Sequence, residues 1–223
     1  MASPKTRTRS SKPRRPGRPA ERDADLRERL LDAALACFAR ASIGSTSLAA
    51  IARQAGVTPA LVHYYFDDKP RLVQAVAEER LLPAMAELRA VTGSAEGDAG
   101  ELLRGFVAGI HALVARHPWL PAIWIREIVT EGGALRELML AQVAPVIPAM
   151  IAARLAQAQA AGRLNGELDP RLLVVSLVGL TLFPLAAQSL WRQFLDAGDV
   201  SDARLQSHTL ALLARGLEIP DAP

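Results

Sequence analysis

The sequence contains one cysteine, few aromatic residues and no recognisable catalytic motif. With Cys37 alone, no intramolecular disulfide can form, and its place on the apolar face of a predicted helix indicates a packed core thiol. Aromatic residues make up 4% of 223 residues. Aliphatic residues and alanine dominate, which favours an all-α chain. Nucleophile-elbow, P-loop, dinucleotide-binding and zinc-protease motifs are absent, so we expect no enzyme, no catalytic residue and no cofactor. His111, His117 and His208 lack metal-ligand spacing, so no metal is expected either.

Positive charge is concentrated in the first third of the chain. Residues 1–80 carry 15 Lys and Arg against 9 Asp and Glu, whereas the remainder carries 11 against 14. A basic N-terminal part joined to a mildly acidic remainder predicts a polyanion as partner of the first part alone. The lone cysteine fits a cytoplasmic setting.

Residues 1–20 hold seven basic residues, four prolines and no acidic residue. This composition predicts a disordered basic arm. The arm contains RRPGRP at Arg14–Pro19, which is similar to the AT-hook core except that Pro16 interrupts it. Two alternatives therefore stay open, namely minor-groove insertion and nonspecific phosphate binding. No apolar segment follows the basic residues, so we expect no secretory signal.

The longest uncharged run is Leu172–Trp191, which is long enough to span a bilayer. It contains polar residues and a proline, and the chain has no second such run. A helix that is apolar all round can equally lie between its own core and a partner subunit. We favour this second interpretation and expect no membrane contact.

Helical periodicity extends over most of the remaining chain. Asp25 and Glu28 have capping-box spacing, Ser47, Thr58 and Asp68 are predicted N-caps, and Gly56 is predicted to end a helix. Pro145, Pro148 and Pro184 fall inside predicted helices and should kink them. The helices are predicted over residues 25–41, 48–55, 59–65, 69–89, 101–116, 120–131, 134–161, 170–196 and 202–217.

Two short helices joined at Gly56 have the character of a helix-turn-helix. Ala52 and Gly56 are small enough for the helices to cross closely, and Ile51 and Val62 face the inside of the pair. The outer face of the second helix is left with Thr58, Pro59, Ala60, His63 and Tyr64, as a recognition helix in the major groove requires. An ordinary helical hairpin is the alternative that this pattern alone leaves open.

The segment Leu30–Val76, LLDAALACFARASIGSTSLAAIARQAGVTPALVHYYFDDKPRLVQAV, closely resembles the DNA-binding domain of the tetracycline-repressor (TetR/AcrR) family. The matching features are LxAA…F in the first helix, TSxxxIAxxAGV, LxxYYF and DxKxxL, in the family's order. The resemblance implies an all-α fold with a three-helix helix-turn-helix domain and a larger C-terminal domain for effector binding and dimerisation. We expect an arm at 1–20, the DNA-binding domain at 21–80 and the ligand-binding and dimerisation domain at 81–223.

The resemblance also implies DNA-contacting residues. Thr46 and Ser47 would donate to phosphate at a helix N-terminus, and Thr58, Tyr64 and Lys69 would hold the DNA backbone. Pro59, Ala60 and His63 would face bases. Of the two adjacent tyrosines, we expect Tyr65 to be the one in the core.

The C-terminal helices are predicted to form an effector pocket and a dimer interface. Apolar and polar candidates for the pocket are Phe106, His111, Trp119, Trp124, Arg126, Glu127, Met139, Met150, Phe183 and Gln188; the alternative for each is an ordinary core position. The last two helices would form a four-helix bundle with those of a second subunit, as in the family. Its apolar stripes contain Leu172, Val175, Leu180, Phe183, Leu190, Leu205, Leu210, Leu213 and Leu217.

These features predict a ligand-responsive transcriptional regulator, most simply a repressor that binds a palindromic double-stranded DNA operator as a homodimer. A small, largely apolar effector would release it from DNA. An architectural DNA-binding protein without effector explains the N-terminal part but leaves the apolar C-terminal part without a role. A small helical enzyme would not need the basic arm or the turn at Gly56.

Overall fold

The computed structural model describes residues 20–93 and 99–217, and every regular element in these ranges is helical. The predicted basic arm at 1–20 lies almost entirely outside the described residues. The helices are α1 Ala20–Arg40, α2 Leu48–Ala55, α3 Pro59–Phe66, α4 Lys69–Val76, α5 Leu82–Gly93, α6 Ala99–Arg116, α7 Leu120–Ile123, α8 Arg136–Gln142, α9 Ile147–Ala160, α10 Pro170–Ala186, α11 Gln188–Phe194 and α12 Asp202–Leu217, with π-helical turns η1 Ala77–Leu81 and η2 Trp124–Val129.

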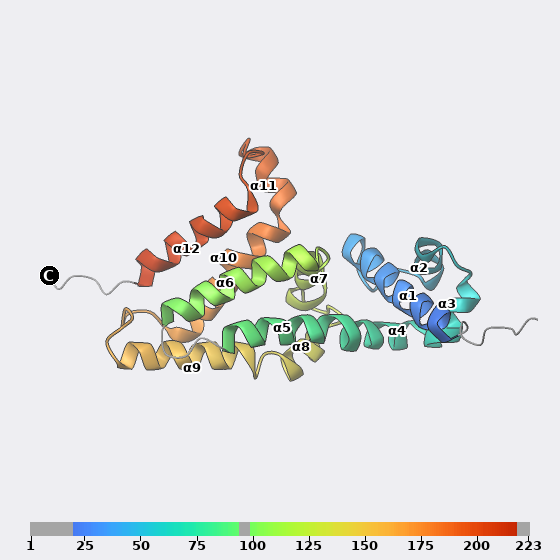
Figure 1. The fold of residues 1–223 in the computed structure, drawn as a ribbon, viewed down its shortest axis with the longest axis horizontal. Coiled ribbons are helices and arrows are strands. Elements are labelled where there is room, and N and C mark those ends of the chain that lie inside the picture. Colours follow the sequence, from blue (N-terminus) through green and yellow to red (C-terminus); the bar gives the residue numbers. More distant parts are fainter. Residues whose placement is uncertain (1–19, 94–98, 218–223) are drawn as a thin grey trace, which may run out of the picture.

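Helices α1, α2 and α3 gather at one end of the molecule (Figure 1). The predicted caps of α2 are confirmed: the Ser47 hydroxyl accepts the Ala50 N–H, and Gly56 ends the helix at φ 69°. Asp68 caps α4 through the Arg71 N–H. Thr58 occupies the N-cap position of α3 but makes no side-chain capping bond, and Pro59 follows at the start of the helix.

Helix α1 begins earlier than predicted, at Ala20 instead of near Asp25. Asp25 therefore lies inside the helix, where every backbone N–H already has a helical acceptor, and it is not an N-cap. The inner face of α1 buries Leu30, Leu31 and Phe38 against Ile51 of α2, together with the predicted core thiol of Cys37. This small apolar core fixes the crossing of α1 and α2.

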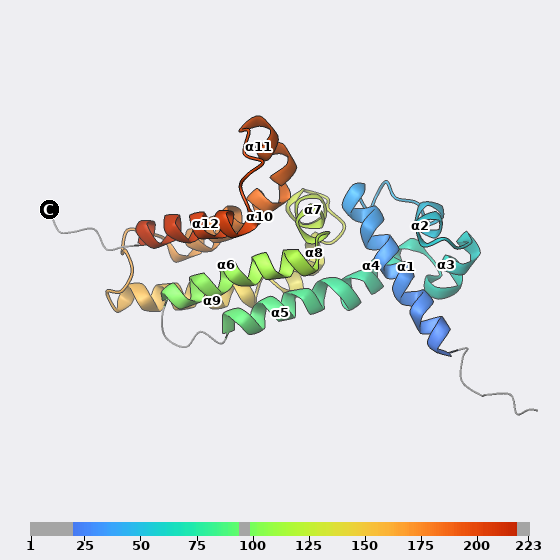
Figure 2. The ribbon, with the colours of Figure 1, turned by 45° about the horizontal axis from the view of Figure 1, so that its top comes forward.

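Helix α4, turn η1 and helix α5 form one continuous rod from the N-terminal helices into the rest of the molecule (Figures 1 and 2). Helix α5 packs along α6, and α6 in turn contacts α9, α10 and α12. The predicted domain boundary at residue 80 falls within η1. One buried apolar cluster extends from α1 to α12.

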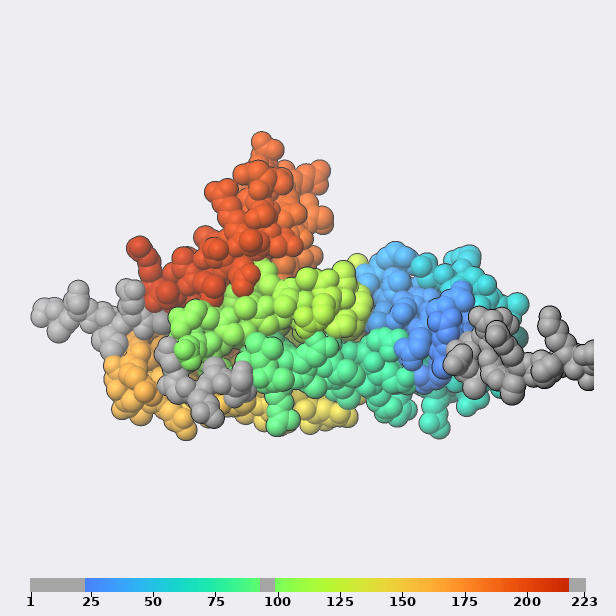
Figure 3. Space-filling view, viewed as in Figure 1, coloured from blue at the N-terminus to red at the C-terminus, as the bar shows by residue number. Residues whose placement is uncertain are grey.

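Two long predicted helices are each divided in the structure. The helix predicted at 134–161 is α8 and α9, separated by residues 143–146 around Pro145, while Pro148 lies in the first turn of α9. The helix predicted at 170–196 bends by 74° between α10 and α11, just after Pro184. As a result, α11 stands away from the body of the molecule (Figure 3).

The uncharged run Leu172–Trp191 crosses this bend. In residues 20–93 and 99–217, no single helix combines the length and the apolar character that crossing a membrane requires. Two bent pairs meet these requirements only when their helices are taken together, namely α8 with α9 and α10 with α11.

Candidate DNA-binding face and effector cavity

Helix α3 presents one face to solvent and buries the other. Val62 and Phe66 are buried beneath it, and Tyr64 on the opposite side is 75% exposed. All five residues predicted for the outer face are exposed: Thr58, Pro59, Ala60, His63 and Tyr64. An eight-residue helix that carries such a free face has the form that a major groove admits.

The polar groups around this face have defined partners. The Asp67 carbonyl lies 2.6 Å from His63 Nδ1 and can only accept, so Nδ1 carries the proton and Nε2 is left as an acceptor in the neutral ring. An acceptor there suits the exocyclic amine of adenine or cytosine. Lys69 donates one N–H to the Gly44 carbonyl at 2.9 Å and keeps two further N–H groups.

One of the predicted roles near this face needs correction. Thr46 is buried, and its hydroxyl donates to the Ser42 carbonyl at 2.9 Å, so its O–H is not free to donate to phosphate. Ser47 is exposed, and its hydroxyl hydrogen is not used by the capping bond that its oxygen accepts. Of the two tyrosines, Tyr65 is the one that packs against the core, as expected, while its hydroxyl donates to Asp23 at 2.9 Å; Phe66 is the fully buried ring of this segment.

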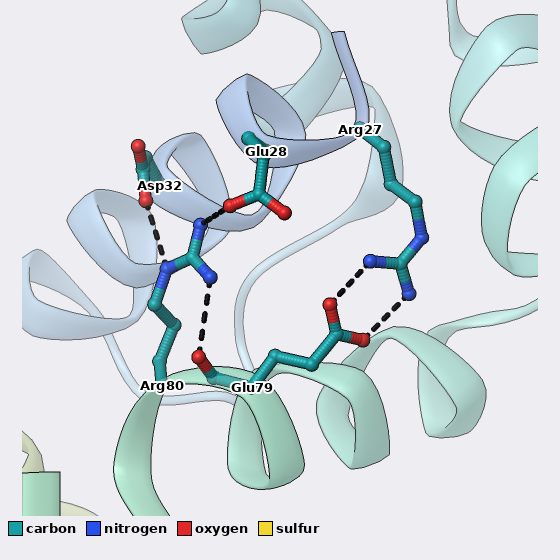
Figure 4. A network of polar contacts seen from close by, with 5 residues as sticks. All are labelled: Arg27, Glu28, Asp32, Glu79 and Arg80. Atoms are coloured by element: carbon teal, nitrogen blue, oxygen red, sulfur yellow. Dashed lines mark hydrogen bonds and ion pairs between the residues drawn. The ribbon is translucent and has the colours of Figure 1, made fainter. Parts of the chain in front are cut away.

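An ion-pair network joins α1 to η1 (Figure 4). Arg27 donates both terminal nitrogens to the Glu79 carboxylate, one of them at 2.6 Å. Arg80 donates to Glu28 at 2.5 Å and to Asp32 at 3.1 Å. The hydrogen bonds from Arg27 hold the pKa of Glu79 below its ordinary value of 4.5. The network therefore fixes α1 against the rod through charged groups that are partly exposed.

Turn η2 also contacts the N-terminal helices, which was not predicted. Arg126 and Glu127 were predicted to line the effector pocket. Instead, Arg126 Nη1 donates to the Ala39 carbonyl of α1 at 2.8 Å, and the buried Glu127 carboxylate accepts the Ile43 N–H at 2.7 Å. The reason is geometric: at η2 the helix lies against the end of α1, and these two side chains point toward it.

A cavity of about 50 Å³ lies between α5, α6, η2, α9 and α10. Phe106 and Trp124 line it, as predicted for an effector pocket. Every other lining residue is apolar as well: Met85, Leu88, Ile110, Leu120, Val143, Ile147, Pro148, Ile151, Val174, Val178 and Leu182. Apart from the indole N–H of Trp124, the lining side chains carry no strong hydrogen-bonding group, which suits an apolar occupant.

The remaining pocket candidates lie elsewhere. His111 and Gln188 line a separate cleft of about 630 Å³ beside α12, because His111 lies one residue beyond Ile110 and so points about 100° around α6. Burial lowers the pKa of His111, and Asp202 partly opposes this. Trp119 packs against His117, and Met139 and Met150 belong to the core. Phe183 is exposed on α10.

The predicted dimer residues separate into three groups. Leu172, Val175, Phe183 and Leu190 are large apolar side chains that are exposed. Leu180, Leu205 and Leu210 are half-buried within the molecule. Leu213 is 7% exposed and belongs to the core, which corrects its assignment to the interface, and the side chain of Leu217 lies outside what the structure describes.

Phe194 and Leu195, at the end of α11, are further exposed apolar side chains that were not predicted, and Leu212 on α12 is exposed as well. Phe194 and Leu195 follow the bend after Pro184; a kink is expected at this proline, but helical periodicity does not place the residues beyond it. A groove of about 450 Å³ between α10, α11 and α12 includes Phe183, Leu195 and Leu212 in its lining. In the described residues, no group of three His, Cys, Asp or Glu side chains could hold a metal ion.

The comparisons with known proteins concern the N-terminal segment first. Residues 30–76 match the sequence model of the bacterial regulatory proteins of the tetR family. The HTH-type transcriptional regulator SrpR of Pseudomonas putida is 39% identical over 59 residues, which are 26% of this chain and 28% of that protein. BetI of Brucella anthropi, also an HTH-type transcriptional regulator, is 36% identical over 70 residues, 31% of this chain and 36% of that protein. The matches thus span about a third of these relatives or less.

Solved structures resemble the chain over most of its length. The ketosteroid transcriptional regulator KstR2 of Mycobacterium tuberculosis has a TM-score of 0.70 at 21% identity, covering 86% of this chain and 94% of that chain. FadR from Bacillus subtilis, solved in complex with stearoyl-CoA, has a TM-score of 0.63 at 19% identity, with coverages of 86% and 99%. These likenesses show the fold, and the segment 30–76 supplies the family. Residues 30–76 therefore belong to the tetR family of bacterial regulatory proteins, and the chain as a whole has the fold of TetR-like regulators.

Proposed function

We propose that this chain is a ligand-responsive repressor that binds a palindromic operator as a homodimer. A small apolar effector releases it from DNA. One observation carries the proposal: the same chain has an exposed recognition face on α3 and an apolar cavity. The cavity is lined in part by α5, the helix that continues from the N-terminal helices through α4 and η1. The regulator is thus equipped both to read DNA and to sense an apolar molecule.

The DNA-contacting roles follow from exposure and chemistry. Pro59, Ala60 and His63 face bases, with apolar contacts to thymine methyl groups from the first two and hydrogen bonding from the third. Ser47 and Lys69 contact phosphates, since each keeps an unused donor beside a helix N-terminus. Thr58 and Tyr64 complete this surface from α3.

The exposed apolar side chains of α10 and α11 support a second copy at this face. On α10, Leu172, Val175 and Phe183 repeat at helical spacing and form a single stripe on one face. A four-helix bundle built from α10 and α12 of two copies would cover this stripe. It would also hold two recognition helices about 34 Å apart, one for each half-site of a palindrome.

The effector is uncharged where it enters the cavity. The lining offers no charged side chain and no hydrogen-bonding group other than the Trp124 indole N–H, so a charged group placed there would lose its hydration without compensation. The cavity of about 50 Å³ is far smaller than the roughly 300–1,000 Å³ of drug-sized ligand sites, so binding must open it. The acyl chain of stearoyl-CoA, the molecule bound to the FadR neighbour, is an occupant of matching chemistry.

Selection of duplexes from a randomised DNA pool tests the DNA-binding part. The proposal expects enrichment of a palindrome with half-sites about one helical turn apart and a steep fall in affinity with added salt. His63→Ala should change the enriched bases, whereas Lys69→Ala should weaken binding to all duplexes alike. Failure of the wild-type chain to enrich any sequence would contradict the proposal.

A further inference from the structure

Both π-helical turns in the described part of the chain contact α1 or the loop that follows it. Turn η1 does so through the ion pairs of Glu79 and Arg80, and turn η2 does so through Arg126 and Glu127. Single π-helical turns inside helices are uncommon and occur frequently at functional sites. The two turns therefore supply polar contacts between the C-terminal and the N-terminal helices, beside the packing of α4 and α7 against α1.

Glu127 makes the more demanding of these contacts. Glu127 is 2% exposed. Its two carboxylate oxygens accept hydrogen bonds from different backbone donors, the Ile43 N–H at 2.7 Å and the Ala134 N–H at 3.2 Å. Burying a carboxylate is costly unless its oxygens are hydrogen-bonded. Because the donors come from segments far apart in sequence, the carboxylate fixes where these two segments lie relative to each other.

The backbone of Glu127 is itself held in place. A Cβ atom added at Gly133 would lie 2.4 Å from the Glu127 carbonyl oxygen, so only glycine permits this approach of the chain. The Leu135 N–H donates to the same carbonyl at 3.0 Å. One residue earlier, Arg126 donates to the Ala39 carbonyl at the C-terminal end of α1, where a cation is favoured.

The segment that Glu127 holds leads directly to the proposed phosphate site. Ile43 is buried in the loop between α1 and α2, and four residues later Ser47 begins the exposed N-terminus of α2. The neighbouring Gly44 carbonyl is held by Lys69, the second proposed phosphate contact. The position of the Ile43 N–H therefore sets the position of both phosphate-contacting groups.

We infer that Glu127 is a positioning residue for the phosphate-contacting end of α2, and that an occupant of the apolar cavity acts on DNA binding by releasing the Ile43 N–H from it. The second half rests on the proposed function. Trp124, the first residue of η2, forms part of the cavity wall, and Glu127 lies three residues further along the same turn. An occupant that displaces the Trp124 ring moves the turn that carries the carboxylate. The freed loop must then be ordered again on DNA, which costs roughly tenfold in affinity for each residue ordered.

Substitutions of Glu127 in the full-length chain test the positioning role. The measurements are the hydrogen-exchange rate of the Ile43 amide and the affinity for the selected palindrome. Glu127→Ala should speed exchange at Ile43 and weaken DNA binding, each about tenfold or more. Glu127→Gln, which offers one acceptor and one donor in place of two acceptors, should give smaller changes of the same sign. Because glutamine nearly preserves the side-chain shape, the Glu127→Gln variant keeps the test possible if the Glu127→Ala variant does not fold.

Arg136→Ala is the matched control. Arg136 donates to the Ile128 and Val129 carbonyls of the same turn but, in its described hydrogen bonds, not to α1 or its loop. This variant should therefore leave Ile43 exchange and DNA affinity unchanged. The inference would be overturned if Glu127→Gln and Glu127→Ala both kept the wild-type exchange rate at Ile43 and the wild-type affinity for DNA.

Filling the cavity tests the link from Trp124. Val178 lines the cavity from α10, and Val178→Phe enlarges a side chain there without altering η2 itself. It should speed Ile43 exchange and weaken DNA binding in the wild-type chain, but add little in Glu127→Ala, because the contact is already lost. Equal effects in both backgrounds, or none in either, would overturn the link. Failure of the wild-type chain to select any DNA would instead contradict the proposed function.

Discussion

Replacing Val175 by glutamate should separate the proposed dimer into monomers that remain folded. Val175 is 67% exposed on α10, so the substitution puts no charge into the core of the isolated chain. In a two-fold symmetric dimer each substitution appears twice, so two carboxylates would lie in the apolar centre of the interface. Each carboxylate would lose its hydration there unless the helices move apart.

The magnitude follows from the exposed area. Fully burying an aliphatic side chain gains about 1.5–3 kcal/mol, so covering the exposed two-thirds of Val175 gains about 1–2 kcal/mol per protomer. Glutamate loses this gain in both copies and adds a desolvation penalty of a few kcal/mol. A total of at least about 3 kcal/mol raises the dimer dissociation constant at least about a hundredfold.

Sedimentation velocity over a range of protein concentrations measures this change, and a thermal melt of the same sample checks the fold. Leu140→Glu is the matched control, because Leu140 is a 53% exposed apolar residue on α8, outside α10–α12. The control should stay dimeric. A Val175→Glu chain that remains dimeric at the wild-type dissociation constant would refute the assignment of α10 to the interface.

Lys69→Ala should weaken binding to every duplex and reduce the salt dependence by about one ion, whereas His63→Ala should change which sequence is preferred; filter binding at several salt concentrations separates the two. Ser47→Ala should cost about 1 kcal/mol of unfolding free energy in a urea titration, because the Ala50 N–H loses its cap. The lowered pKa of Glu79 stabilises the fold above pH 4.5, and this contribution is lost as pH falls through the lowered value. Glu79→Gln should therefore be less stable by about 0.5–1 kcal/mol at pH 7 and equally stable near pH 2, measured by urea titration at both pH values. A difference that persists at pH 2 would contradict this role of the ion pair.

The sequence predicts the N-terminal helices well because their ends depend on local chemistry. Ser47, Gly56 and Asp68 act through their own neighbours, and each ends or begins a helix as expected. The start of α1 was predicted wrongly because Asp25 resembles a cap but lies where the chain is already helical. Capping patterns describe a preference that a longer helix can override.

The bends and the cavity could not be predicted in the same way. Pro184 indicates a kink, but the 74° turn that follows it depends on how α11 leaves the packed body. Periodicity also does not tell which apolar face of a helix meets its own core and which stays uncovered. For this reason Leu213, predicted at the interface, is buried, and Leu212 beside it is exposed.

The polar residues of the predicted pocket show the same limit. Arg126 and Glu127 are charged residues in an apolar stretch, which indicates a buried role but not the partner. Their partners, the Ala39 carbonyl and the Ile43 N–H, are backbone groups more than 80 residues earlier in the chain. Backbone donors and acceptors leave no mark in a sequence, so only the folded arrangement identifies this contact.

The central claim is that two copies of this chain read one palindrome through α3. Titration of the selected palindrome with the full-length chain, followed by fluorescence anisotropy and by the mass of the complex, tests it directly. The account predicts two chains on each duplex and an affinity at least about a thousandfold above that for a scrambled duplex of the same composition. Equal affinities for the two duplexes, or one chain bound at full affinity, would contradict it.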